Sequence, residues 1–291
     1  MIRVKPEQNS PLSLHASVGG LAIFLDAFAI KELARRDRSR RNRFIAAVHR
    51  GAEVLFSVSN AAELSGPQGE SFVEIRNFMN EIGPHWFPVE LDPMLVAQRE
   101  RQGKPSDQSC FSGDFLKGYL QSRVSSSPKE RVIGVSEELF TLGHVMDWLA
   151  PQRESIARGK RELDRALIEK IKDHRAQHEV DPGWLDKHFP ALPFTPAFPG
   201  TFAYVNLVRV LILESRSFVI MPGDGIDFCQ AVIGSAFSTF ATLDKKWKRR
   251  VETLPQPNKL ARIYYSPELD VLVDDIESAL VLLEERTSVS S

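Results

Sequence analysis

Cysteine is scarce in this sequence of 291 residues, which holds only Cys110 and Cys229. The two thiols are far apart and show no metal-ligand spacing, so neither a disulfide framework nor a cysteine-based zinc site is expected. Long hydrophobic runs are also lacking. The stretch from Val205 to Leu213 is interrupted by Asn206 and Arg209, which makes it too short and too polar to span a bilayer. The first ten residues lack the apolar segment of a signal peptide, so we expect a cytoplasmic protein without membrane association.

An excess of either charge sign is absent as well. The sequence has 37 Lys and Arg residues against 38 Asp and Glu residues, a formal net charge of −1. This balance excludes a uniformly basic nucleic-acid binder and a strongly acidic tail protein, although it leaves local patches open. Hydrophobic residues make up 43% of the chain, which is enough for a sizeable core. At roughly 100–200 residues per domain, the length allows one large domain or two small ones.

Short apolar runs alternate with helical patterns along the chain. The apolar runs predict strands at Leu21–Leu25, Glu53–Ser57, Thr239–Leu243 and Ala261–Tyr265. Helical spacing of apolar residues predicts helices at 27–34, 71–82, 202–213, 228–237 and 268–285. Strands that alternate with helices indicate an α/β layer architecture with a mainly parallel sheet.

The middle of the chain has a different pattern. Residues 152–178 are densely charged with both signs, which indicates an exposed helix. Its apolar residues form one narrow stripe, at Leu163, Leu167 and Ile171. We therefore predict that residues 84–200 are a mainly helical insertion, packed beside the sheet without extending it. Residues 1–83 and 201–291 are predicted to form the domain that this insertion interrupts.

Acidic residues stand where predicted strands end or predicted helices begin. Asp26 and Asp244 each follow a strand, Asp224 and Asp227 open one helix, and Glu63 lies early in another. Parallel sheets bind ligands beyond the carboxyl ends of their strands, near a topological switch point. We expect the carboxylates of Asp26, Glu63, Asp227 and Asp244 to lie within ~10 Å of one another, close enough to share Mg²⁺ or Mn²⁺. Such a cluster suits metal-assisted attack of water on phosphodiesters.

Each acid also has a purely structural interpretation. Asp26 and Asp244 stand at strand-to-helix junctions, where Asp is a common N-cap. Asp224 and Asp227 suit the positive end of a helix dipole. Glu63 suits the first turn of a helix or one half of a capping box. What favours the site is the joint pattern of the five acids and their sequence context.

The segments around these acids resemble the motifs of the PIN-domain nucleases, in the order of that family. The four segments are Phe24–Ile30, Ser57–Leu64, Asp227–Ile233 and Ala241–Trp247. The last contains Thr-x-Asp followed by basic and aromatic residues. The resemblance covers roughly residues 18–83 and 202–275. The stretch between Glu63 and Asp227 is much longer than a compact PIN domain needs, which is the main departure.

The resemblance implies a PIN-like three-layer α/β/α fold and a Mg²⁺- or Mn²⁺-dependent nuclease. It assigns Asp26, Glu63, Asp227 and Asp244 as catalytic metal ligands, and Asp224 competes with Asp227 for the third position. The implied substrate is RNA, with single-stranded DNA as the other option. A homodimer or a regulatory protein partner is compatible with the family.

Two basic clusters fit a polyanionic substrate. Residues 35–43 hold six arginines in nine positions, and 245–250 hold five cations and one indole directly after Asp244. The candidates for contact with nucleic acid are Arg38, Arg40, Arg41, Lys245, Lys246, Trp247 and Lys248. The alternatives are a solvated loop, a surface helix with Trp247 packed inward, and arginines that pair with the chain's own acidic C-terminal segment.

Two other functions stay open at this point. One is a non-catalytic PIN-like module that binds nucleic acid or a partner protein. The other is an α/β phosphohydrolase with a small-molecule substrate. The sequence contains no Gly-x-Ser-x-Gly elbow, which disfavours a serine hydrolase. It also contains no phosphate-binding P-loop, which disfavours a P-loop nucleotide hydrolase.

Overall fold

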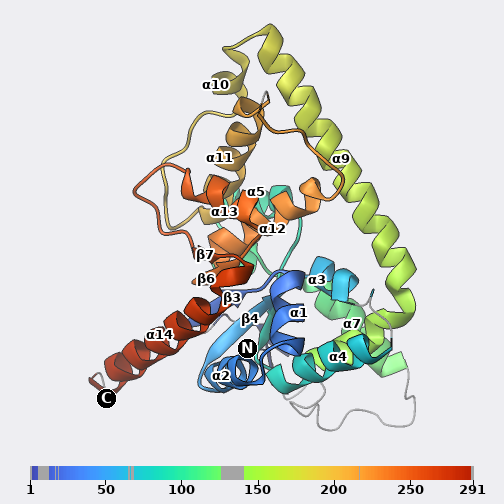
Figure 1. Ribbon diagram of the computed structural model, residues 1–291. Coiled ribbons are helices and arrows are strands. Elements are labelled where there is room, and N and C mark those ends of the chain that lie inside the picture. Colours follow the sequence, from blue (N-terminus) through green and yellow to red (C-terminus); the bar gives the residue numbers. More distant parts are fainter. Residues whose placement is uncertain are drawn as a thin grey trace.

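The computed structural model describes residues 2–5, 13–16, 18, 20–64, 66, 69–125, 141–215 and 217–289. A five-stranded sheet lies at its centre, with all strands parallel and in the order β5-β4-β3-β6-β7 (Figure 1). These strands are β3 (Leu21–Phe24), β4 (Ala52–Phe56), β5 (Trp86–Pro88), β6 (Phe240–Thr242) and β7 (Arg262–Tyr264). The alternation of strands and helices predicted from the sequence is confirmed.

The strands are largely apolar because the sheet is covered on both faces. All four residues of β3 are buried. Leu21 and Ile23 belong to the core on one face, whereas Ala22 and Phe24 belong to the core on the other. A continuous apolar run is what a strand covered on both faces requires.

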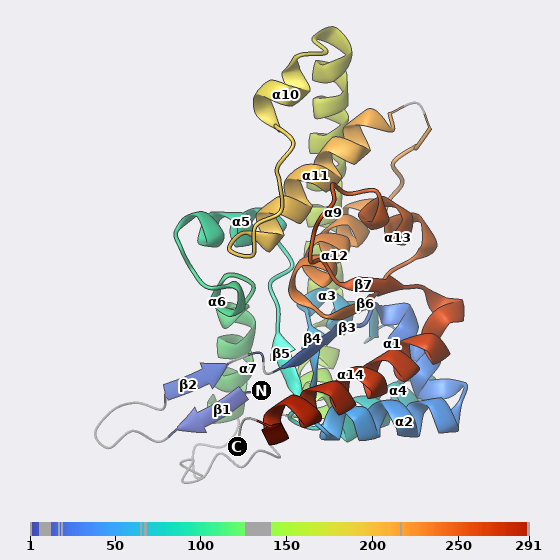
Figure 2. The same ribbon diagram turned by 90° about the vertical axis from the view of Figure 1, so that its left-hand side faces the viewer.

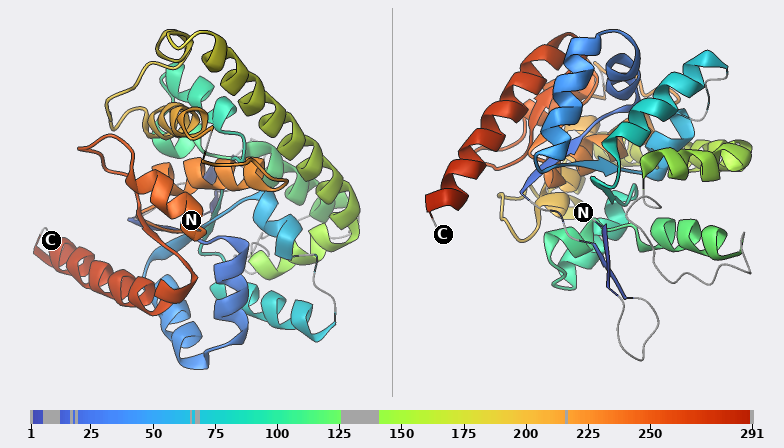
Figure 3. Two further views of the ribbon diagram at one scale, coloured as in Figure 1. Left: turned by 45° about the horizontal axis from the view of Figure 1, so that its top comes forward. Right: turned by 90° about the horizontal axis from the view of Figure 1, so that it is seen from below.

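Two layers of helices enclose this sheet (Figures 2 and 3). The first layer contains α1 (Ala27–Arg35), α2 (Arg38–His49), α4 (Glu70–Ile82), α8 (Leu142–Leu149) and α14 (Leu269–Val289). The second contains α5 (Pro93–Arg101), α9 (Arg153–Val180), α11 (Pro199–Leu213), α12 (Asp224–Phe237) and α13 (Lys245–Glu252). The fold is therefore a three-layer α/β/α architecture, as the sequence predicted.

The remaining helical elements complete the fold. They are α3 (Val58–Leu64), α6 (Ser106–Ser109), α7 (Gly113–Ser125), α10 (Trp184–His188) and the 3-10 turns η2 (Ala150–Gln152) and η3 (Ser266–Glu268). An antiparallel pair, β1 (Ile2–Lys5) and β2 (Ser13–Ala16), forms a separate small sheet that the sequence did not predict. None of the described helices combines the length and apolar character needed to cross a membrane.

The region 84–200 corrects one prediction. It was expected to leave the sheet unextended, yet it contributes the edge strand β5, which pairs with β4 from Val54↔Trp86 to Phe56↔Pro88. The strand is only three residues long, too short for an alternating pattern, and Pro88 is tolerated because β5 is an edge strand. The rest of the region is mainly helical where the structure describes it. Its longest element, α9, packs against α3, α11 and α12.

Candidate acidic site at the sheet edge

The switch point of the sheet lies between β3 and β6. From β3 the chain moves outward to β4 and β5, and it then returns to β6 beside β3 and continues to β7. In open parallel sheets, the crevice beyond the carboxyl ends at this point is the usual ligand site. Asp26 follows β3 and Asp244 follows β6, so both acids stand on the same edge, on either side of the switch point.

Asp26 is held in place by the helix that it caps and by the neighbouring strand β6. It is the N-cap of α1, and its Oδ1 accepts hydrogen bonds from the Ala29 N–H at 2.8 Å and the Thr242 hydroxyl at 3.1 Å. Its own N–H donates to Thr242 Oγ1 at 2.8 Å, which ties the end of β3 to β6. The N-cap interpretation is therefore confirmed, and the same carboxylate also faces the other acids.

The pKa of Asp26 shows how it interacts with those acids. Burial raises this pKa from 3.8 to about 6, and the carboxylates of Glu63 and Asp244 add to the rise. The hydrogen bonds from Ala29 and Thr242 oppose it. Ionisation of Asp26 is therefore unfavourable in this environment, and a cation bound nearby would make it more favourable.

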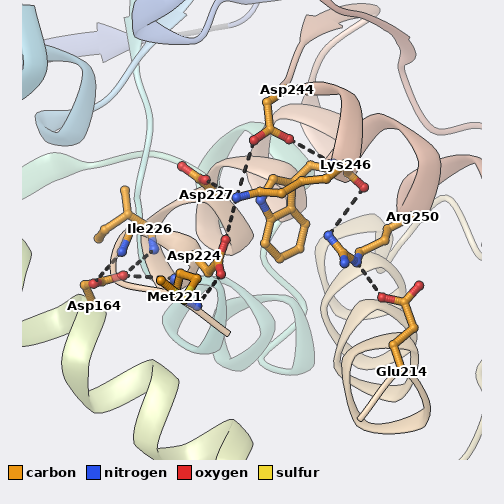
Figure 4. A network of polar contacts seen from close by, with 12 residues as sticks. Asp164, Glu214, Met221, Asp224, Ile226, Asp227, Asp244, Lys246 and Arg250 are labelled. Carbon is orange, nitrogen blue, oxygen red and sulfur yellow. Dashed lines mark hydrogen bonds and ion pairs between the residues drawn. The ribbon is translucent and has the colours of Figure 1, made fainter. Parts of the chain in front are cut away.

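Three more acids converge on the ammonium group of Lys246 (Figure 4). Lys246 Nζ lies 2.5 Å from Asp224 Oδ1, 3.1 Å from Asp227 Oδ2 and 3.4 Å from Asp244 Oδ2. Burial acts to lower the pKa of Lys246, but the hydrogen bond to Asp224 and the other two carboxylates outweigh it and raise this pKa. A lysine in the first turn of α13 therefore serves as the counter-ion of the cluster.

Asp224 and Asp227 have different surroundings although both stand in the first turn of α12. The Asp224 side chain is only 4% exposed, and its Oδ2 accepts the Met221 N–H at 2.6 Å. Burial raises the pKa of Asp227; Lys246 opposes the rise, and Asp244 and Glu63 add to it. Asp224 thus closes the turn before the helix, whereas Asp227 faces the remaining acids.

Glu63 reaches the cluster from α3. The helix starts at Val58, so Glu63 lies in its second turn, whereas the sequence indicated the first. Glu63 Oε1 pairs with the ammonium of Lys160, from α9, and lies 3.5 Å from the amide nitrogen of Gln230, from α12. The long helix of the 84–200 region therefore contributes a residue to the edge of the acidic site.

Asp164 fixes the position of α12, the helix that carries two of these acids. Its Oδ2 accepts the Gly223 N–H at 2.8 Å, and its Oδ1 accepts the N–H groups of Gly225 at 2.9 Å and Ile226 at 3.3 Å. The approach is so close that a Cβ at position 225 would lie 2.8 Å from the Asp164 carbonyl oxygen. A buried carboxylate of α9 thus supplies the N-terminal cap that α12 lacks in its own sequence.

We expect Asp164→Ala to lower the free energy of unfolding by about 2 kcal/mol, because three backbone donors lose a charged acceptor. Urea denaturation measures the loss. Glu162→Ala removes an exposed carboxylate from the same helix and is the control, with an expected change within about 0.5 kcal/mol. Equal stabilities for the two variants would contradict the capping role.

The side chains at the sheet edge have the chemistry of a divalent cation site, but the carboxylates face ammonium groups. Asp and Glu oxygens are the ligands that Mg²⁺ and Mn²⁺ prefer. Among the described residues, no group of three or more His, Cys, Asp or Glu side chains is arranged to hold a metal ion as it stands. Lys246 and Lys160 explain this arrangement, because each ammonium attracts carboxylate oxygens to itself.

Most of the predicted nucleic-acid contacts are engaged within the chain. The prediction that Trp247 contacts nucleic acid is wrong. Its side chain is 1% exposed and packs on Phe228, so it cannot stack on a base. The ion pairs are Arg40 with Asp270, Arg41 with Glu81, and Lys248 with Glu268. Arg38 and Lys245 are exposed. The first basic cluster therefore pairs largely with acids of α4 and α14, which favours the alternative interpretation of that cluster.

Sequence reasoning missed three contributors to this edge. Thr242 forms hydrogen bonds with Asp26, and it is the threonine of the Thr-x-Asp pattern that ends at Asp244, so the sequence contained a signal for it. Lys160 and Gln230 contact Glu63 from elements distant in sequence, so no local pattern could place them there.

Comparison with known proteins adds no family assignment. No protein-family model matches the sequence, and neither a curated protein nor a solved structure matches the chain.

Proposed function

We propose that this protein is a Mg²⁺- or Mn²⁺-dependent nuclease that cleaves RNA, with a PIN-like arrangement of its acidic residues. The observation that carries the proposal is the convergence of carboxylates from β3, β6, α3 and α12 at the switch point of a parallel sheet. A cytoplasmic location and RNA as the partner belong to the same proposal.

The residues that would hold the cation are Asp26, Glu63, Asp227 and Asp244. When bound, the cation supplies the usual chemistry of such sites, namely a water molecule acidic enough to attack a phosphodiester at neutral pH. The chain's own contribution is a fixed set of oxygen ligands, since Thr242 and Ala29 orient Asp26. Lys246 is 40% exposed at its side chain, so its ammonium can leave the cluster without disturbing the core.

Cation binding is expected to weaken as the pH falls through 6. The pKa of Asp26 is about 6, so protons compete with the cation for this carboxylate below that pH. For a single competing proton, the apparent Mn²⁺ affinity falls about fourfold at pH 5.5 relative to pH 7.5. Titration of Mn²⁺ into the protein at both pH values measures this ratio. An affinity that is unchanged between them would contradict the part assigned to Asp26.

The test of the function is incubation of the protein with labelled RNA and labelled single-stranded DNA. We expect cleavage of RNA in Mn²⁺ and none in chelator. Cleavage of DNA alone would change the substrate class but keep the metal-dependent chemistry. Intact RNA and intact DNA after incubation with Mn²⁺ would contradict the proposal.

One observation favours the alternative, a non-catalytic binding module. Lys160 pairs with Glu63, and Lys246 pairs with Asp224, Asp227 and Asp244, so two cations already offset part of the negative charge and reduce the electrostatic need for a metal ion. The same assay separates the two functions, because this alternative predicts RNA or protein binding without cleavage and without stabilisation by Mn²⁺.

A further inference from the structure

Helix α9 carries four cations that have no acidic partner among the residues that the structure describes. Arg158, Arg161, Arg165 and Lys172 are all exposed. None of the four has an acidic partner within 4 Å in the described part of the chain. The arginine-rich run at 35–43 differs, since Arg40 and Arg43 there are bound to Asp270 and Asp274 of α14.

These four cations lie on one side of the helix. Their spacings of three, four and seven residues repeat the α-helical period, so the side chains form a stripe along the axis. We call Arg158, Arg161, Arg165 and Lys172 the α9 stripe. Glu162 and Glu169 stand close to it, so the stripe is a local excess of positive charge and not an unbroken basic surface.

The stripe borders a hollow in the surface. Arg161, Arg165 and Lys172 line a hollow of about 310 Å³ together with Ile220 and Pro222, and Asp164 and Glu169 are its acidic members. Asp164 contributes little free acceptor capacity there, because its oxygens already accept three backbone N–H groups. The hollow is therefore lined by three cations and one available carboxylate.

The hollow lies next to the acidic site. Pro222, on its rim, stands two residues before Asp224, and α12 starts at Asp224. On the other side of α9, Lys160 reaches Glu63 of α3. Figures 1 and 3 show the long helix α9 running past α3 and α12, along one side of the molecule. The α9 stripe thus belongs to a helix that contacts two of the elements that carry the acids.

We propose that the α9 stripe binds the phosphate backbone of a single-stranded RNA and holds it beside the acidic site. A row of exposed arginines at the period of a helix suits successive phosphates, which bind through charge and counter-ion release without reading the base sequence. This inference rests on the proposed nuclease function, for which it names the substrate-holding surface. It assigns the 84–200 region the task of holding the substrate.

The test is RNA binding by the triple variant Arg158→Gln/Arg161→Gln/Arg165→Gln of the full chain. Fluorescence anisotropy with a labelled 12-nucleotide RNA, in chelator, measures binding without cleavage across a series of salt concentrations. If each arginine neutralises one phosphate, the slope of log K against log salt loses about 0.7 per contact, or about 2 in total. The affinity then falls about 100-fold at 0.1 M salt.

The matched control is the triple variant Lys104→Gln/Lys187→Gln/Lys259→Gln. These three exposed lysines also lack an acidic partner within 4 Å among the described residues, and the change in net charge is the same. We expect it to keep at least a third of the wild-type affinity. Both triple variants are expected to melt at the wild-type temperature, since every altered side chain is exposed.

The outcomes separate this inference from the proposed function. Normal binding by the α9 variant, or equal losses in both triple variants, overturns the stripe as the binding surface, while cleavage by the wild type still decides the nuclease. Selective loss of binding in the α9 variant supports the stripe, whether or not the wild type cleaves. A wild type that neither binds nor cleaves RNA overturns both proposals.

Discussion

Asp26→Asn is expected to abolish Mn²⁺-dependent RNA cleavage and, at the same time, to raise the stability of the metal-free protein. The cleavage rate should fall by orders of magnitude because the cation loses an anionic oxygen. The α1 cap should survive, because Asn caps helices about as well as Asp and its Oδ1 can accept the Ala29 N–H.

The gain in stability follows from the raised pKa of Asp26. Its pKa in the folded protein is about 6, above the value of 3.8 expected when unfolded, so the folded state binds more protons between these two values. The stability contributed by Asp26 therefore falls as the pH rises from about 4 to about 6 and stays low above that. The shift corresponds to roughly 3 kcal/mol. We expect Asn to recover about 2 kcal/mol at pH 7.5, a rise of roughly 3 °C in Tm, and almost nothing at pH 4.

Melting in chelator at both pH values, together with the cleavage assay, measures both effects. Asp37→Asn is the matched control, because Asp37 caps α2 through the Ser39 and Arg40 N–H groups but lies away from the acidic cluster. It should leave cleavage and stability nearly unchanged. Full cleavage by Asp26→Asn would reduce Asp26 to a helix cap.

Lys246→Met is expected to destabilise the metal-free protein by about 3 kcal/mol and to strengthen Mn²⁺ binding about tenfold. Without the ammonium, the buried carboxylate of Asp224 loses its cation, and Asp227 and Asp244 repel each other and Asp224. A divalent cation no longer has to displace a lysine and relieves this repulsion. Most of the lost stability should therefore return when Mn²⁺ is added.

Lys245→Met provides the control for this experiment. Lys245 is the exposed neighbour whose ammonium lies 5.9 Å from the centre of the Tyr265 ring, and no carboxylate of the described chain lies within 4 Å of it. Thermal melting with and without Mn²⁺ compares the two variants. If both melt alike and respond alike to Mn²⁺, Lys246 is not the counter-ion that competes with a metal.

The parts of this protein that the sequence predicts are those governed by local patterns. The runs that become β3 and β6 are short and largely apolar, and each is followed by an acid that caps a helix. Asp26 and Asp244 could therefore be placed on one edge of a parallel sheet. The strand β5 escaped prediction because Trp86–Pro88 is too short to show a period.

Contacts between distant segments account for the remaining differences. Arg40 and Arg43 belong to one of the two basic clusters that fitted a polyanionic substrate, yet α14 folds back onto α2 and supplies Asp270 and Asp274 to them. The sequence offered Trp247 as a base-stacking residue, yet it lies on the face of α13 that packs against the core. The arginines of α9 did not stand out in the sequence, because acidic residues surround them. Only the fold shows that the helix carrying them packs against α12.

Anomalous diffraction from crystals grown with Mn²⁺ tests the central claim most directly, namely that the carboxylates at the β3–β6 edge hold a catalytic cation. The account predicts a manganese peak among Asp26, Glu63, Asp227 and Asp244, with the Lys246 ammonium withdrawn from the two aspartates that it contacts there. Crystals of the Asp26→Asn variant grown with Mn²⁺ should lack the peak. The claim would be contradicted if no manganese were bound at this edge and Lys246 still contacted Asp224, Asp227 and Asp244.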